Sequence, residues 1–213
     1  RRFCEKEVEP RIADWNRNGI TDRATWRRMG EEGFLGPCLP VEYGGAGGDF
    51  LYDAIVMEEL SWRRAHGLMT TVHASICMPY VAAFGTEAQK LRYLPPAIRG
   101  ELLMGICMTE PGTGSDLANV QTRAVRDGDH YVLNGSKTFI SNGQNCDLVI
   151  VVAKTDPTKR HDGISLLLVE TSTPGFRRGR NLEKIGLKGQ DTSELFFEAC
   201  RVPVENLLGQ EGG

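Results

Sequence analysis

Apolar residues recur at helical spacing in the first hundred positions. Thr21 and Asp22 can cap a helix on which Trp26 and Met29 fall three residues apart, on one face. Gly33 follows a charged turn at the place where that helix should end. The pattern therefore predicts a short amphipathic helix with Trp26 and Met29 in the core.

Two later segments have too few polar residues for helices that face solvent. Residues 50–65 and 68–84 are rich in large apolar side chains, so we expect both segments to be buried helices. Thr86 and Gln89 then have capping-box spacing, and the pair Pro95-Pro96 should end the helix that the box opens.

After residue 100 the pattern changes to short apolar or alternating runs between turn residues, which is typical of strands joined by hairpins. Asn134-Gly135 is the strongest hairpin signal, and Asp127-Gly128-Asp129 also indicates a turn. The runs are 102–108, 120–126, 131–133, 136–140, 148–154, 163–170 and 193–198. We therefore predict an α+β protein, with an all-α domain at 1–102 and an antiparallel β-barrel or sandwich domain at 103–213.

Composition narrows the class of protein. Among 213 residues, 25 Lys and Arg against 28 Asp and Glu give a net charge of −3 without long runs of one sign, which argues against nucleic-acid binding. The longest apolar stretch, 148–153, is far short of the roughly 20 residues that span a bilayer. We expect a soluble protein without a membrane span. Both ends of the chain look cut, because it lacks an initiator Met and a signal region and stops in a Gly pair.

The six cysteines are scattered, with no Cys-x-x-Cys pair and no Cys/His cluster. We expect free, mostly buried thiols in a reducing compartment and no metal site. The glycine-rich stretch 44–48 resembles a phosphate loop, but it lacks a preceding β-α unit, so we interpret it as a tight turn.

The segment 108–116 is the first candidate for chemistry. Gly112 and Gly114 would let the backbone approach a flat or phosphorylated ligand, while the hydroxyls of Thr109 and Ser115 supply short hydrogen bonds. From residue types alone an ordinary Pro-Gly loop with an Asp cap explains the segment as well.

A second candidate lies at the end of another predicted strand. Phe139 offers an aromatic face and Ser141 a hydroxyl before a Gly turn, which suits a flat heteroaromatic ring. Phe139 and Ile140 could equally be core residues of the strand.

Three motifs, taken together, resemble the acyl-CoA dehydrogenase family in order and spacing. They are Thr109-Glu110-Pro111-Gly112-x-Gly114-Ser115-Asp116, Asn134-Gly135-x-Lys137-x-x-Ile140-x-Asn142-Gly143 and Gly189-x-Asp191-Thr192-Ser193-x-Leu195-x-Phe197. Shorter matches at 39–45, 202–203 and 206–209 extend the similarity over essentially the whole chain, and 163–170 with 179–188 look most like long-chain-type members.

The resemblance implies FAD as cofactor and an acyl-CoA as substrate. Carried over from the family, the cofactor-binding residues would be Ile106, Met108, Thr109, Gly114, Ser115, Phe139, Ile140 and Ser141. The substrate-binding residues would be Ser115, His161 and Asp162. The implied reaction is α,β-dehydrogenation of a fatty acyl-CoA to the trans-2-enoyl-CoA, with electrons passed to an electron-transfer flavoprotein.

The chain departs from the family pattern at its end. It stops at Gly213, where the family's C-terminal helical bundle with the catalytic Glu would begin, so we assign no catalytic residue. The full-length protein would be a homotetramer in the bacterial cytoplasm or the mitochondrial matrix. An acyl-CoA oxidase, a flavin monooxygenase of the same fold and a non-catalytic binding module remain alternatives.

Overall fold

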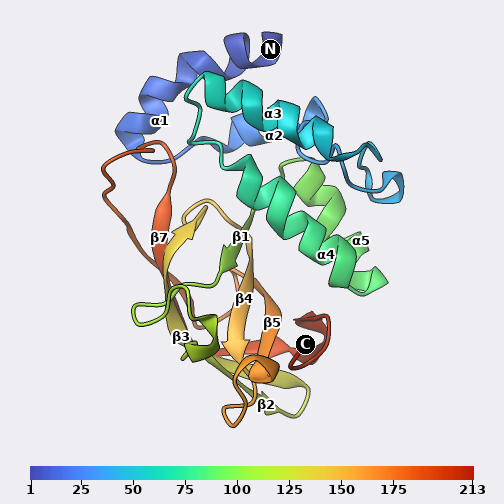
Figure 1. The fold of residues 1–213 in the computed structure, drawn as a ribbon, viewed down its shortest axis with the longest axis vertical. Coiled ribbons are helices and arrows are strands. Elements are labelled where there is room, and N and C mark those ends of the chain that lie inside the picture. The colour runs from blue at the N-terminus through green and yellow to red at the C-terminus, as the bar shows by residue number, and fades with distance from the viewer.

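A computed structural model describes residues 1–213, with the helices gathered on one side and the strands on the other (Figure 1). The helices are α1 (Ile12–Asn18), α2 (Arg23–Glu31), α3 (Phe50–Trp62), α4 (Met78–Phe84) and α5 (Glu87–Ile98), with short π or 3-10 segments at Cys4–Val8, Glu9–Arg11, Val41–Tyr43 and Thr71–Cys77. The strands are β1 (Met104–Cys107), β2 (Arg123–Asp127), β3 (His130–Ser141), β4 (Leu148–Lys154), β5 (Ile164–Glu170), β6 (Phe176–Asn181), β7 (Thr192–Pro203) and β8 (Leu207–Leu208). The predicted fold class, a helical part followed by a β part, is confirmed.

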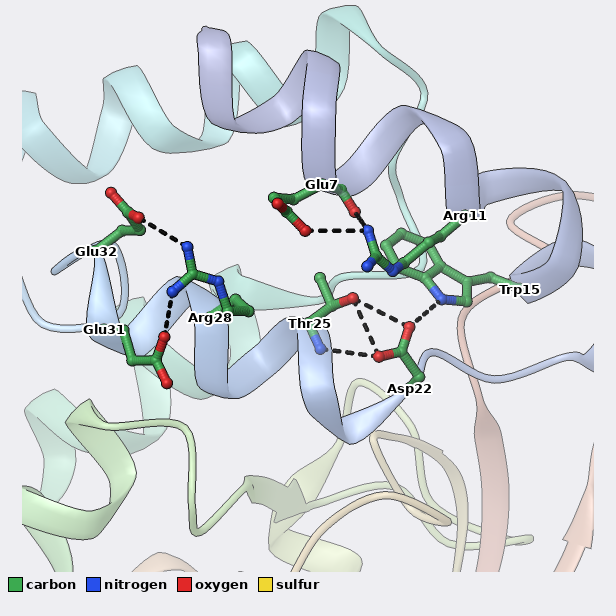
Figure 2. Close-up of polar contacts among 8 residues, drawn as sticks. All are labelled: Glu7, Arg11, Trp15, Asp22, Thr25, Arg28, Glu31 and Glu32. Atoms are coloured by element: carbon green, nitrogen blue, oxygen red, sulfur yellow. Dashed lines mark hydrogen bonds and ion pairs between the residues drawn. The ribbon is translucent and has the colours of Figure 1, made fainter.

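Helix α2 begins where its cap residue predicts. Asp22 accepts the backbone N–H of Thr25 and the indole N–H of Trp15, both at 2.8 Å (Figure 2). Trp26 is fully buried, and Gly33 has a φ of +76° just beyond the helix end. One carboxylate thus caps α2 and ties it to α1.

Helix α5 confirms its predicted start but not its predicted end. The Thr86 N–H donates to Gln89 Oε1 at 2.9 Å and the Gln89 N–H donates to Thr86 Oγ1 at 3.3 Å, which is a full capping box. Pro95 and Pro96 lie inside the helix, which continues to Ile98. The prediction that they end the helix is wrong, because burial of Ala97 and Ile98 in the core outweighs the backbone bonds lost at the prolines.

Helix α3 contradicts the prediction that it is buried. Only Asp53 and Leu60 of the helix are buried, whereas five of its large hydrophobic side chains are more than half exposed: Phe50, Leu51, Tyr52, Ile55 and Trp62. An apolar helix without a polar face can bury only one side against a single layer, so its other side stays exposed. No helix of the structure is long and apolar enough to cross a bilayer.

The sheet is mixed rather than purely antiparallel, which corrects that detail of the prediction. Its strand order is β6-β7-β3-β2-β4-β5-β8, and β1 pairs with β4. The β1–β4 pairing is parallel, as is the single β2–β4 pair. A parallel pair requires a long crossover, and here the segment between β1 and β4 contains the β2–β3 hairpin.

The turn of the β2–β3 hairpin does not lie at Asn134-Gly135, which is the strongest turn signal in the sequence. Gly128, with a φ of +63°, joins β2 to β3, whereas Asn134 and Gly135 lie inside β3. The β3–β7 register shifts between Leu133 and Gly135, and a side chain at Gly135 would collide with Thr122. The Asn-Gly pair therefore forms a bulge, and the glycine is needed for close backbone approach.

Strand β4 is buried along its whole length because it separates two cores. Leu148 and Ile150 join the larger core, which the helices supply, while Val149 and Val151 join a second core inside the sheet. All six cysteines are free thiols; five are buried and Cys38 is partly exposed. The larger core thus joins the helical part to one face of the sheet, whereas the second core is formed by the β part alone.

Candidate functional site

The end of β1 carries the first group of predicted site residues. Ile106, Met108 and Thr109 are all partly exposed. The N–H of Thr138 in β3 donates to the carbonyl oxygen of Thr109 at 2.9 Å, which joins this loop to the end of β3. The backbone N–H groups of Met108 and Thr109 have no acceptor within the protein. Two adjacent donors are therefore available to a ligand.

Glu110 follows directly and is buried. Its carboxylate accepts the N–H groups of Gln121 at 2.6 Å and Thr122 at 2.9 Å, and the ammonium of Lys137 at 2.9 Å. Burial acts to raise the pKa of Glu110, but the hydrogen bonds from Thr122, Gln121 and Lys137 outweigh it and lower the pKa below its ordinary value. A buried carboxylate that is held ionised and saturated with donors is unsuited to abstract a proton from a substrate.

The tip of the loop is exposed and closed by a pair of backbone hydrogen bonds between Glu110 and Thr113. Gly114 and Ser115 follow directly after this turn and are also exposed. A Cβ added at Gly112 or Gly114 would meet no atom within 4 Å, and neither glycine has a positive φ. Nothing within the chain therefore requires glycine at these two positions.

The end of β3 holds the second group. The β3–β7 register shifts between Lys137 and Ile140, and within this bulge Phe139 has a φ of +59° and is 65% exposed. Such a conformation is a true outlier for an aromatic residue. Ile140 is buried in the second core, and Ser141 Oγ accepts from Gln190 Nε2 at 2.6 Å. The bulge presents the aromatic ring of Phe139 to the surface.

An apolar groove of about 820 Å³ runs between α4 and the strands. Of the predicted residues it is lined by Ile106, Met108 and His161; Asp162 is exposed nearby but does not line it. The sequence predictions missed most of its walls, which are Tyr80, Phe84, Leu117, Val152, Ile164, Leu166 and Leu208. No local pattern in the sequence brings these residues together, because they come from a helix and several strands far apart in the chain.

Thr109, Ser115, Phe139 and Ser141 do not line this groove. The predicted residues thus fall into two groups, which are adjacent in the chain at Met108 and Thr109. One group lines the apolar groove, and the other lies on the loop after β1 and on the bulge of β3. No three His, Cys, Asp or Glu side chains are close enough to hold a metal ion.

Family models match both halves of the chain. The model for the N-terminal domain of acyl-CoA dehydrogenases matches residues 1–101, and that for the middle domain matches residues 105–200. The chain belongs to the acyl-CoA dehydrogenase family. The family resemblance stated from the motifs is therefore confirmed.

The long-chain specific acyl-CoA dehydrogenase of Sus scrofa mitochondria is 46% identical over 99% of this chain and 50% of its own length. The chain thus spans about half the length of the curated relatives it matches. The crystal structure of an acyl-CoA dehydrogenase from Geobacillus kaustophilus is 52% identical with a TM-score of 0.97, over 99% of this chain and 56% of that one. An acyl-CoA dehydrogenase from Bacillus anthracis, solved in complex with FAD, is 35% identical with a TM-score of 0.90, over 99% of this chain and 36% of that one.

Proposed function

We propose that the chain is the part of an acyl-CoA dehydrogenase that binds FAD and the acyl-CoA, and that the full-length enzyme converts a fatty acyl-CoA to the trans-2-enoyl-CoA. The observation that carries the proposal is the surface at the ends of β1 and β3. There the unpaired N–H groups of Met108 and Thr109 lie in the loop that is bonded to β3 one residue before the exposed ring of Phe139.

This surface fits a flavin. A flat heteroaromatic ring needs hydrogen-bond donors at its polar edge and an aromatic or apolar face, which Thr109 and Phe139 supply. The glycines at 112 and 114 are not required by the protein itself, so close approach of a ligand explains them. The relative from Bacillus anthracis, which binds FAD, supports the same choice of cofactor.

The groove beside Met108 fits an acyl chain. Its walls are mostly apolar, its volume of about 820 Å³ suits a long flexible ligand, and His161 adds a polar group for the CoA part. In this proposal Ser115 also contacts the acyl-CoA, and Asp162 lies by its CoA part, both outside the groove.

FAD, when bound, accepts a hydride from the substrate. The residues of this chain bind and orient the two ligands, and the proton is removed by a carboxylate outside the chain, because Glu110 is engaged by three donors. Residues 1–102 and 103–213 form the two domains of this proposal. The exposed apolar side of α3 is then available to further helices of the full-length protein. The proposed electron acceptor is an electron-transfer flavoprotein, the proposed assembly a homotetramer, and the compartment the bacterial cytoplasm or the mitochondrial matrix.

The proposal is tested by FAD titration of the full-length apoprotein and two matched variants. Thr109→Val removes a hydroxyl that bonds nothing within the chain, whereas Thr113→Val removes one that donates to Asn119 O at 3.1 Å. We expect Thr109→Val to weaken FAD binding by about 0.5 to 1.5 kcal/mol with little effect on stability, and Thr113→Val to lower stability by a similar amount. A Thr109→Val protein with unchanged FAD affinity and flavin potential would contradict the assigned role.

A further inference from the structure

A buried ion pair lies directly behind the Met108–Thr109 segment. The Lys137 side chain, in β3, is fully inaccessible, and that of Glu110 is 4% exposed. The Lys137 ammonium donates to Glu110 Oε1 at 2.9 Å and to the carbonyl oxygen of Met108 at 3.1 Å. Lys137 therefore binds two groups of the loop that carries Thr109, the backbone carbonyl of Met108 and the carboxylate of Glu110.

Stability alone is a poor reason for this pair. Removing two charges from water costs several kcal/mol per ion, and apolar residues of similar volume often stabilise a protein as well or better. A buried pair at this point therefore calls for a geometric explanation.

The geometry is that of one peptide plane. In a trans peptide the C=O and N–H point in opposite directions. The Met108 carbonyl is directed at Lys137, so the Thr109 N–H of the same peptide unit points away from the Lys137 side chain. Thr138 fixes the next carbonyl, that of Thr109, at 2.9 Å. Consecutive carbonyls are thus anchored to β3, which leaves the Thr109 N–H without an acceptor in the protein.

We propose that Lys137, with Glu110 as its counter-ion, is a positioning residue that fixes the Met108–Thr109 peptide so that the Thr109 N–H donates to the bound flavin. The inference rests on the proposed function, and it adds a role for two residues that touch neither cofactor nor substrate. A donor fixed in advance costs no reorganisation when the cofactor binds or is reduced.

The test compares Lys137→Met with Lys154→Met in the full-length protein. Lys154 is a matched control, a mostly buried lysine of the same sheet whose ammonium donates to the carbonyls of Ala118 at 2.9 Å and Arg160 at 2.8 Å. We expect both variants to unfold at lower temperature. Only Lys137→Met should weaken FAD binding, by about tenfold, which corresponds to about 1.4 kcal/mol. Only this variant should also lower the flavin midpoint potential, because the Thr109 N–H is no longer held in position to donate to the electron-rich reduced ring.

A double variant separates positioning from the cost of an unpaired buried charge. Lys137→Met with Glu110→Gln leaves no lone carboxylate, and the glutamine oxygen still accepts a backbone N–H. We expect this double variant to regain stability over Lys137→Met while FAD affinity and potential stay lowered. The inference would be overturned if the double variant recovered stability, FAD affinity and flavin potential together. It would also be overturned if Lys137→Met and Lys154→Met changed FAD affinity and potential equally. Either result would leave the proposed function intact. A wild-type protein that binds no FAD would overturn the proposed function, and the inference with it.

Discussion

Acidification should destabilise this protein through His73, which joins the helical part to the sheet. The ring is fully buried, its Nε2 lies 3.1 Å from the carbonyl oxygen of Ala97 in α5, and its Nδ1 accepts the N–H of Met104 in β1 at 3.1 Å. Nε2 therefore carries the proton of a neutral ring. A second proton would bind to Nδ1, where the Met104 N–H already donates, so two donors would face each other and the hydrogen bond would be lost.

Burial lowers the pKa of His73 from 6.5 to about 4. Between these values the unfolded chain binds a proton that the folded protein does not, so stability falls as the pH falls through this window. For one such group the loss is about 2 kcal/mol at pH 5 and about 3 kcal/mol below pH 4. A loss of 2 kcal/mol is a large part of the 5 to 15 kcal/mol typical of a folded domain.

Urea unfolding of the wild type and His73→Asn at pH 7, 6 and 5 measures this effect. The asparagine keeps an acceptor for Met104 but does not titrate, so the variant should be less stable at pH 7 and lose about 2 kcal/mol less than the wild type on going to pH 5. His66→Asn, at an exposed position, is the control and should follow the wild type. Equal pH dependence in the wild type and His73→Asn would refute the reasoning.

Three further predictions concern packing, strain and thiols. Gly30→Ala should lower the free energy of unfolding by about 1 to 3 kcal/mol, because the new methyl group would collide with the backbone of Arg99. The control Gly186→Ala meets no atom within 4 Å and should leave the stability unchanged, and thermal unfolding compares the two variants. Phe139→Asn should stabilise the apoprotein by about 1 kcal/mol, since asparagine tolerates the positive φ, yet weaken FAD binding; a less stable apoprotein would contradict this. A thiol reagent should label Cys38 first in the native protein and the buried thiols only after unfolding, since burial raises the pKa of several of them.

Local signals were reliable where a few neighbouring residues decide the structure. The caps of α2 and α5 each depend on two side chains three residues apart, and both were predictable. The end of α5 and the exposure of α3 depend on contacts with distant parts of the chain, and both predictions were wrong. Strand β6 was missed because Arg177, Arg178 and Arg180 conceal it, although it pairs with β7 at the sheet edge.

The candidate site shows the same division. The motifs located Thr109 and Phe139, because each lies in a short contiguous segment of unusual composition. The groove could not be predicted, since Phe84, Met108 and Leu208 come from a helix, the loop after β1 and a strand, which lie far apart in sequence. The link between Lys137 and Glu110 spans 27 residues and involves two buried charges that hydrophobic patterns place on the surface.

Anaerobic titration of the purified full-length protein with acyl-CoAs of several lengths tests the central claim most directly. We predict that the protein carries FAD, that an acyl-CoA bleaches the flavin absorbance, and that residues 1–213 alone give no bleaching because the proposed base lies outside them. A full-length protein that takes up no FAD, or whose flavin no acyl-CoA reduces, would contradict the account.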